Sequence, residues 1–212
     1  MKGFSEYDLN SAVEERYSKL AVISQGLGCG SALELVELRR GEVVVDLGCG
    51  RGKEALAAAK AVGASGHVYG VDGSEAMITA AGEQAQGLDQ LTLLRAPLHD
   101  TGLPAGLADA VISNCAINHA LAKDAVYREI FRLLKKGGRF AVSDIIAEST
   151  LPQEVREDPA AWAACYGGAL TLAENERAIR SAGFERLQIL EMSEPYEKEG
   201  IYLRKLTVSS IK

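Results

Sequence analysis

The alternation of apolar runs with helix-forming segments between residues 43 and 143 constrains the fold more than any other feature. Residues 43–47 (VVVDL) form an apolar run typical of a strand buried on both faces, and residues 53–61 that follow are strongly helix-forming. The same pattern predicts further strands at 67–71, 91–94, 109–113 and 139–143, and helices at about 74–86 and 123–135. Such alternation requires right-handed crossovers, so we expect a parallel sheet with helices on both faces.

The flanking segments extend this plan at both ends. Apolar side chains at 4–24 have loosely helical spacing, and Ser31 with Glu34 predicts a capped helix to residue 38. Near the other end the sequence predicts short helices at 152–165, a helix at 171–182 and strands at 184–192 and 200–208. We therefore expect an N-terminal helical lid at 1–40. The domain at 41–212 should be α/β and Rossmann-like, with a doubly wound seven-stranded sheet, an antiparallel C-terminal edge pair and a helical insertion at about 150–170.

Composition excludes several classes of protein. The chain has 212 residues, 47% of them hydrophobic, and its 29 acidic against 23 basic residues give a net charge of −6, which disfavours a nucleic-acid partner. No apolar run reaches the roughly 20 residues of a membrane span, and no secretory signal opens the chain, so we expect a cytoplasmic protein without a membrane partner.

The cysteines are widely spaced, at 29, 49, 115 and 165. In a reducing compartment this spacing predicts neither a disulfide framework nor a zinc ribbon, and we expect no metal. The plain alternative for all four is that they are small buried residues.

The segment after the first predicted strand carries the main binding motif. In an open sheet of this kind, ligands bind outside the carboxyl ends of the strands. Here that end reads DLGCGRG (46–52), with Gly48, Gly50 and Gly52 able to adopt positive φ and the next helix N-terminus able to bind an anion. The G-x-G-x-G spacing and the preceding Asp46 differ from the G-x-G-x-x-G fingerprint of dinucleotide sites. Asp72, which follows the second strand, can accept hydrogen bonds from both hydroxyls of a ribose.

This motif resembles motif I of class I S-adenosylmethionine-dependent methyltransferases, in which a carboxylate suits the ammonium of the methionine moiety. The resemblance implies S-adenosylmethionine as cofactor. It assigns the binding residues Asp46, Gly48, Gly50, Asp72, Gly73, Met77, Leu98 and Asn114. For Met77 a core position is an equal alternative. Leu98 follows the third strand, near the adenine edge, and Asn114 follows the fourth, where the sulfonium would lie.

Longer segments resemble the arsenite methyltransferase family. They are LGCG (27–30), VVVDLGCGRGKEALAAAKAVG (43–63), VYGVDGSEAM (68–77), VISNCAIN (111–118), REIFRLLKKGGRFAVSDI (128–145) and LPQEVREDPAAWAACYGGAL (151–170). The resemblance implies an acceptor such as arsenite or a related metalloid, held by cysteine thiolates because trivalent arsenic is thiophilic. Cys165 matches an arsenic-ligating cysteine of the family, and Cys49 matches a cysteine that some members have in motif I. The chain has no cysteine after Cys165, where the family has a further one, and its N-terminal arm is short.

Several functions remain open at this stage. His119 stands where the resembled motif usually has an aliphatic residue, and it could act as a general base toward an oxygen or nitrogen acceptor. Its plain alternative is a solvated loop histidine. A protein that binds S-adenosylmethionine without turnover is a further hypothesis, and the glycine spacing argues against a nicotinamide dehydrogenase. We expect a transferase of EC class 2.1.1 acting on a small-molecule acceptor, and a homodimer stays open.

Overall fold

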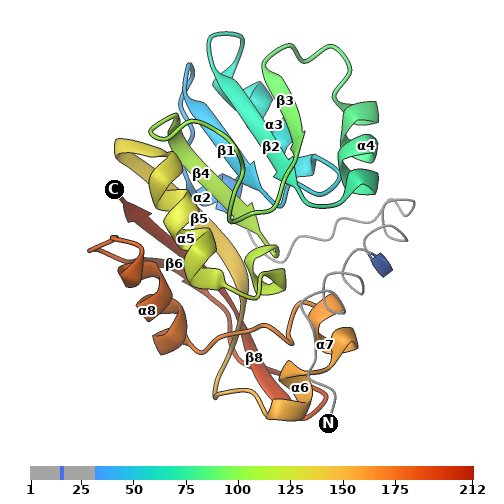
Figure 1. Cartoon of the computed structure of the whole chain (residues 1–212). Helices are drawn as coiled ribbons and strands as arrows, with labels where there is room; N and C mark the ends of the chain where they lie inside the picture. The colour runs from blue at the N-terminus through green and yellow to red at the C-terminus, as the bar shows by residue number, and fades with distance from the viewer. Residues whose placement is uncertain (1–14, 17–31) are drawn as a thin grey trace.

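The computed structural model describes residues 15–16 and 32–212, and its strands form one mixed sheet (Figure 1). The strand order is β3-β2-β1-β4-β5-β8-β6, and β7 pairs with β8 beside this path. The strands are β1 (Val43–Leu47), β2 (His67–Asp72), β3 (Leu91–Arg95), β4 (Ala108–Asn114), β5 (Leu134–Ala147), β6 (Gln188–Met192), β7 (Tyr196–Lys198) and β8 (Ile201–Ile211). Strands β1 to β5 are parallel, whereas β8 runs antiparallel to β5, β6 and β7.

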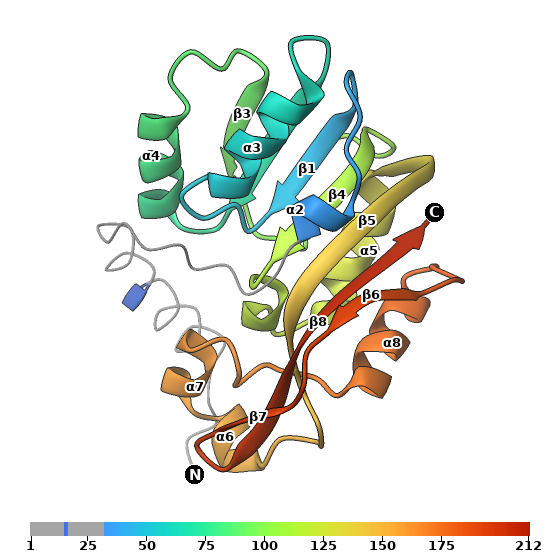
Figure 2. The same ribbon diagram turned by 180° about the vertical axis from the view of Figure 1, so that it is seen from behind.

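Helices cover both faces of the sheet (Figures 1 and 2). One face carries α2 (Ala32–Leu35), α3 (Lys53–Val62) and α4 (Glu75–Gln84). The other carries α5 (Lys123–Leu133) and α8 (Leu172–Ser181). The 3-10 turn η1 (Ile117–His119) follows β4, and the short helices α6 (Gln153–Arg156) and α7 (Pro159–Ala163) lie beyond the carboxyl ends of the parallel strands. This arrangement is the doubly wound α/β fold that the alternation predicts.

The core is divided by the sheet into two layers. Val44 packs in the cluster under α2 and α3, whereas its neighbour Val45 packs in the cluster under α5 and α8, because successive strand side chains point to opposite faces. Ser74 caps α4 through the backbone N–H of Met77, as the sequence predicts. Thr171 and Glu174 form a capping box at the start of α8.

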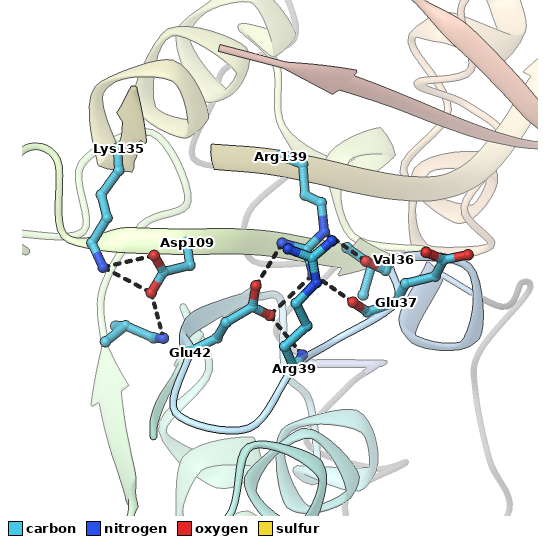
Figure 3. A network of polar contacts seen from close by, with 8 residues as sticks. Val36, Glu37, Arg39, Glu42, Asp109, Lys135 and Arg139 are labelled. Atoms are coloured by element: carbon cyan, nitrogen blue, oxygen red, sulfur yellow. Dashed lines mark hydrogen bonds and ion pairs between the residues drawn. The ribbon is translucent and has the colours of Figure 1, made fainter. Parts of the chain in front are cut away.

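A polar network joins the amino ends of the central strands to the loop before β1 (Figure 3). The guanidinium of Arg139 on β5 forms an ion pair with Glu42 at 2.9 Å and donates from Nε to the carbonyl of Val36 at 2.7 Å. Lys135 binds Asp109, which also accepts the backbone N–H of Val43 at 2.8 Å. These contacts fix the entry into β1 at the end of the sheet opposite the glycine motif.

The structure confirms the fold class and most of the predicted elements, and it corrects three details. Strand β5 begins at Leu134, ahead of the glycine pair at 137–138 where the sequence predicts a helix end, and a register shift against β4 accommodates the irregular stretch. Strand β7 was not predicted, and β6 begins only at Gln188. The predicted helical lid at 1–40, including the Ser31 cap, lies largely outside the described residues.

Among the described residues, the structure contains no helix with the length and apolarity needed to cross a bilayer.

Candidate functional site

The carboxyl ends of β1 and β4 form the centre of the candidate site. These strands are neighbours in the sheet, and the strand order reverses between them, with β2 and β3 on one side and β5 on the other. Asp46 on β1 is paired in register with Ile112 of β4 and Gly70 of β2. Residues that follow β1, β2 and β4 therefore converge at one edge of the sheet, which is where open α/β sheets bind ligands.

The loop after β1 adopts the left-handed backbone that its glycines permit. Gly48 has φ of 81° and Gly50 has φ of 52°. The backbone of Gly48 packs against the turn after β4, because a Cβ built on it would lie 2.1 Å from the Cβ of Ala116. A Cβ on Gly50 would meet no atom within 4 Å among the described residues. Gly48 thus serves close packing between two loops, while Gly50 leaves room for a ligand.

The carboxyl group of Asp46 is buried and poorly satisfied. Its side chain is only 2% exposed, and Oδ2 has no hydrogen-bond partner among the described residues. Burial, together with the nearby carboxylates of Glu54 and Asp72, raises the pKa of Asp46 well above its usual value. An unpartnered acceptor among other acidic groups fits a ligand that brings positive charge and N–H donors, such as an α-ammonium group.

Asp72, the last residue of β2, is held by two backbone donors. The N–H of Gly50 donates to Oδ2 and the N–H of Ser74 donates to Oδ1, each at 2.9 Å. Burial raises the pKa of Asp72 despite these hydrogen bonds. Because each carboxylate oxygen can accept two hydrogen bonds, both remain able to accept one from a sugar hydroxyl. The adjacent Gly73 leaves open space where a Cβ would stand.

The remaining predicted cofactor residues surround this edge with different exposures. Met77 is completely buried at the start of α4, and Leu98 is half-buried against the core under α5. The amide of Asn114 donates from Nδ2 to Oε1 of Glu54 at 2.7 Å. Glu54 was not predicted as a site residue, since an acidic residue in the first turn of a helix is common for reasons of helix electrostatics alone.

The acceptor side of the candidate site brings together two of the predicted residues. The imidazole Nε2 of His119, on η1, lies 3.1 Å from Sγ of Cys165, which follows α7. Asn118 Nδ2 donates to the carbonyl of Cys165 at 3.0 Å, so the turn after β4 and the segment after α7 are joined directly. His119 is therefore half-buried against Cys165 and is not the solvated loop residue of the plain alternative.

Cys49 occupies a different environment. It is 7% exposed and packs with Val44 and Ala55 in the layer under α3, and its Sγ lies close to Gly70. Burial, with Asp46 and Asp72 nearby, raises the pKa of this thiol well above its usual value. Cys49 thus belongs to a core cluster that does not contain Cys165.

The structure corrects one expectation about the cysteines. Cys115, which directly follows β4, is disulfide-bonded, whereas Cys49 and Cys165 form no disulfide. The partner of Cys115 lies outside the described residues. Spacing along the chain failed here because a disulfide depends on which loops the fold brings together. Within the described residues, no three His, Cys, Asp or Glu side chains are grouped to hold a metal ion.

Comparison with known proteins agrees with this architecture. Residues 38–197 match the methyltransferase domain family. An arsenite methyltransferase of Halobacterium salinarum is 37% identical over 81% of this chain and 44% of its own length. One from Aquipseudomonas alcaligenes is 35% identical over 77% of this chain and 49% of its own length. The chain thus spans about half the length, or less, of these curated relatives.

A solved structure also resembles this chain. The crystal structure of an arsenic(III) S-adenosylmethionine methyltransferase from Chlamydomonas reinhardtii superimposes with a TM-score of 0.77 at 28% identity, covering 97% of this chain and 73% of that chain. With the strand order and the glycine loop, these matches define the class: the chain belongs to the methyltransferase domain family of Rossmann-like, S-adenosylmethionine-dependent methyltransferases. The curated relatives that it resembles are arsenite methyltransferases, of which it spans about half the length or less.

Proposed function

We propose that the chain transfers a methyl group from S-adenosylmethionine to a small soft acceptor, arsenite or a related trivalent metalloid, held by Cys165. The observation that carries the cofactor half is that Oδ2 of Asp46 has no partner within residues 32–212, in a loop whose Gly50 has open space around it. The observation that carries the acceptor half is the position of the Cys165 thiol, 3.1 Å from Nε2 of His119 and joined to the turn after β4 through Asn118. The arsenite methyltransferase relatives support the same acceptor class.

The residues of the site have distinct roles in this proposal. Asp46 binds the ammonium group, Asp72 accepts from the ribose hydroxyls, and the backbone around Gly50 admits the methionine chain. Leu98 and Gly73 would border the adenosine, and Asn114 the sulfonium, whereas the completely buried Met77 supports the core behind them. When bound, S-adenosylmethionine supplies an electrophilic methyl on a positively charged sulfur. Cys165 fixes the acceptor so that its lone pair faces that methyl in line. Alignment of this kind can supply about 7–11 kcal/mol of the barrier.

A second candidate is methyl transfer to an oxygen or nitrogen acceptor, with His119 as general base. Its structural ground is that His119 follows β4 on the acceptor side of the candidate site, half-buried against Cys165. Burial, together with the charges of Lys123 and Arg16, lowers the pKa of His119 to about 4, so the ring is neutral near pH 7 but a weak base. The 3.1 Å contact directs that ring at Cys165, which supports the soft acceptor over this alternative.

The test is methyl transfer from labelled S-adenosylmethionine to a panel of arsenite, thiols, amines and phenols. We expect arsenite to be methylated by the wild-type chain and this activity to fall at least about tenfold in Cys165→Ser, because a hydroxyl is a poor ligand for a soft centre. Ile189→Ser serves as the control, since Ile189 is an exposed residue on β6 outside the candidate site. Methylation of another panel member that persists in Cys165→Ser would overturn the acceptor assignment. Cofactor binding without transfer to any member would indicate a binding protein.

A further inference from the structure

The contact between Cys165 and His119 joins two segments that are remote in sequence. His119 ends η1, directly after β4, and Cys165 follows α7, and the two residues are 46 positions apart. The distance of 3.1 Å between Nε2 and Sγ is a hydrogen-bond distance for a thiol and an imidazole. Because sulfur binds soft acceptors only after its proton leaves, the destination of that proton matters for the chemistry of Cys165.

The surrounding structure holds this pair in place. The backbone N–H of Asn118 donates to Oδ2 of Asp144 at 3.0 Å, and its side-chain amide donates to the carbonyls of Ile145 and Cys165 at 2.7 and 3.0 Å. Gly168 packs so tightly that a Cβ on it would lie 2.0 Å from the carbonyl oxygen of Asn118. The turn η1 therefore fixes the positions of the His119 imidazole and of the segment that carries Cys165.

The backbone of Cys165 is also constrained. Its φ is 67°, in the left-handed region that favours glycine and strains a residue with a side chain. The carbonyl of Ala161 accepts the N–H groups of Tyr166 and Gly167, the two residues after Cys165, so the chain turns sharply at Cys165. The conformation directs the thiol toward η1.

The charges around the pair keep the imidazole neutral. The ammonium of Lys123, on α5, donates to the carbonyl of Ala120 at 2.9 Å and lies 5.0 Å from the ring centre of Trp162. Burial, then Lys123 and then Arg16, lower the pKa of His119, while a hydrogen bond to the backbone of Trp162 opposes them. Burial raises the pKa of Asp144 to about 6, although backbone hydrogen bonds and the charge of Lys123 oppose this. Tyr196 of β7 lies near the thiol.

We propose that His119 is the proton acceptor that activates Cys165 when the metalloid binds. Nε2 takes the thiol proton as sulfur forms its bond to the trivalent metalloid hydroxide, and it gives that proton up in the same concerted exchange, because an imidazolium with a pKa of about 4 does not persist near pH 7. The proton passes to the departing hydroxide, which leaves as water, so no electron is gained or lost by the metalloid in this step. The inference rests on the proposed function, and it assigns His119 a role at Cys165 instead of at an oxygen or nitrogen acceptor.

The experiment follows metalloid binding through tryptophan fluorescence. Trp162 is the single tryptophan of the chain, and its carbonyl accepts the N–H of Cys165, so its emission reports on this segment. Wild type, His119→Gln, His119→Leu and the control His67→Gln are mixed rapidly with arsenite between pH 6 and 9. His67 lies at the amino end of β2, far from the site along the strand, and contacts Thr92.

We expect a binding rate for wild type and His67→Gln that changes little with pH. Both His119 variants should bind at least about tenfold more slowly at pH 6.5, with a rate that rises about tenfold per pH unit below the ordinary thiol pKa of about 8.5, because only the thiolate then reacts. Glutamine can still hydrogen-bond the thiol, so a purely structural role predicts normal kinetics in His119→Gln. Normal kinetics and a normal pH profile in that variant would overturn the inference.

A second reaction separates this inference from the proposed function. If arsenite changes no fluorescence in wild type, the metalloid assignment fails, and alkylation of Cys165 by iodoacetamide is followed by peptide mass spectrometry instead. In that reaction a sulfur–carbon bond forms, iodide leaves and the thiol proton again passes to His119. Slower, more pH-dependent alkylation in both His119 variants would support the proton-acceptor role. Equal rate–pH profiles in wild type and variants would overturn it.

Discussion

The carboxyl group of Asp46 is costly to ionise in the free protein, and its surroundings suit a positively charged ligand. A carboxylate that is 2% exposed and lacks a partner on Oδ2 is costly to ionise in the free protein. Its raised pKa means that the folded chain holds this proton to higher pH than the unfolded chain does, so its contribution to stability declines as pH rises above about 4. An ammonium ligand reverses this by stabilising the ionised form. The residue is therefore suited to a ligand more than to the fold.

Two glycines of one loop provide a matched test of packing against ligand access. Alanine at Gly48 would meet Ala116 at 2.1 Å with φ of 81°, whereas alanine at Gly50 would meet no described atom within 4 Å at φ of 52°. We expect Gly48→Ala to lower the free energy of unfolding by at least about 2 kcal/mol, from overpacking and backbone strain. Gly50→Ala should cost about 1 kcal/mol and chiefly weaken binding of S-adenosylhomocysteine.

Urea unfolding and calorimetry measure the two effects separately. Gly87→Ala is the control, because Gly87 has φ of 81° and equally open surroundings in a loop remote from the motif. If Gly50→Ala bound S-adenosylhomocysteine like wild type while remaining folded, the ligand would not pass over this backbone.

At the scale of elements, the two ends of the parallel strands differ in what they carry. The carboxyl end carries the glycine loop, and the amino end is held by the Arg139 network (Figure 3). Arg139 binds Glu42 in a two-pronged arrangement, with distances of 2.9 and 3.0 Å, and the N–H of Arg39 donates to the same carboxylate. The network ties the segment before β1 to β5, so it sets the position of the strand that presents Asp46.

This network makes a prediction about pH. Although burial opposes ionisation, the hydrogen bonds from Arg139 and Arg39 lower the pKa of Glu42 below its usual value. A lowered pKa stabilises the fold above the unfolded-state pKa of about 4.3 and loses that effect as pH falls through the folded-state value. We expect Glu42→Gln to lower the free energy of unfolding by about 1–2 kcal/mol at pH 7. The difference from wild type should shrink below about pH 4.

Chemical denaturation at a series of pH values measures this difference. Glu83→Gln is the control, since Glu83 is exposed on α4. A stability gap between Glu42→Gln and wild type that stayed constant down to pH 3 would show that the charge of Glu42 contributes nothing.

Helices and strands that depend on local sequence could be predicted, and those that depend on pairing with another strand could not. The strand at 43–47 and the helix after it follow from the apolar run and from helix propensity, and Ser74 caps a helix as expected. Strand β5 starts before its glycines because pairing with β4 extends it, and β7 exists only as a partner of β8. A register shift or a short edge pairing leaves no periodicity in the chain itself.

At the scale of the whole molecule, the reversal of strand order between β1 and β4 determines where the site lies. The convergence of residues 46–52 and Asp72 at one edge of the sheet could be predicted, because these residues follow consecutive strands. Their roles toward a cofactor stay predictions. The contact of His119 with Cys165, the contact of Asn114 with Glu54 and the disulfide at Cys115 could not be predicted, since each depends on segments that meet only after folding.

The central claim is that the loop after β1 binds the amino-acid end of a sulfonium nucleoside through Asp46. Its most direct measurement is titration calorimetry of S-adenosylhomocysteine, which carries the same ammonium group. The control is Asp89→Asn, at an exposed carboxylate outside the site. The account predicts saturable one-to-one binding by wild type and by Asp89→Asn, and an affinity at least about tenfold lower in Asp46→Asn. Absence of binding in wild type, or unchanged affinity in Asp46→Asn, would contradict it.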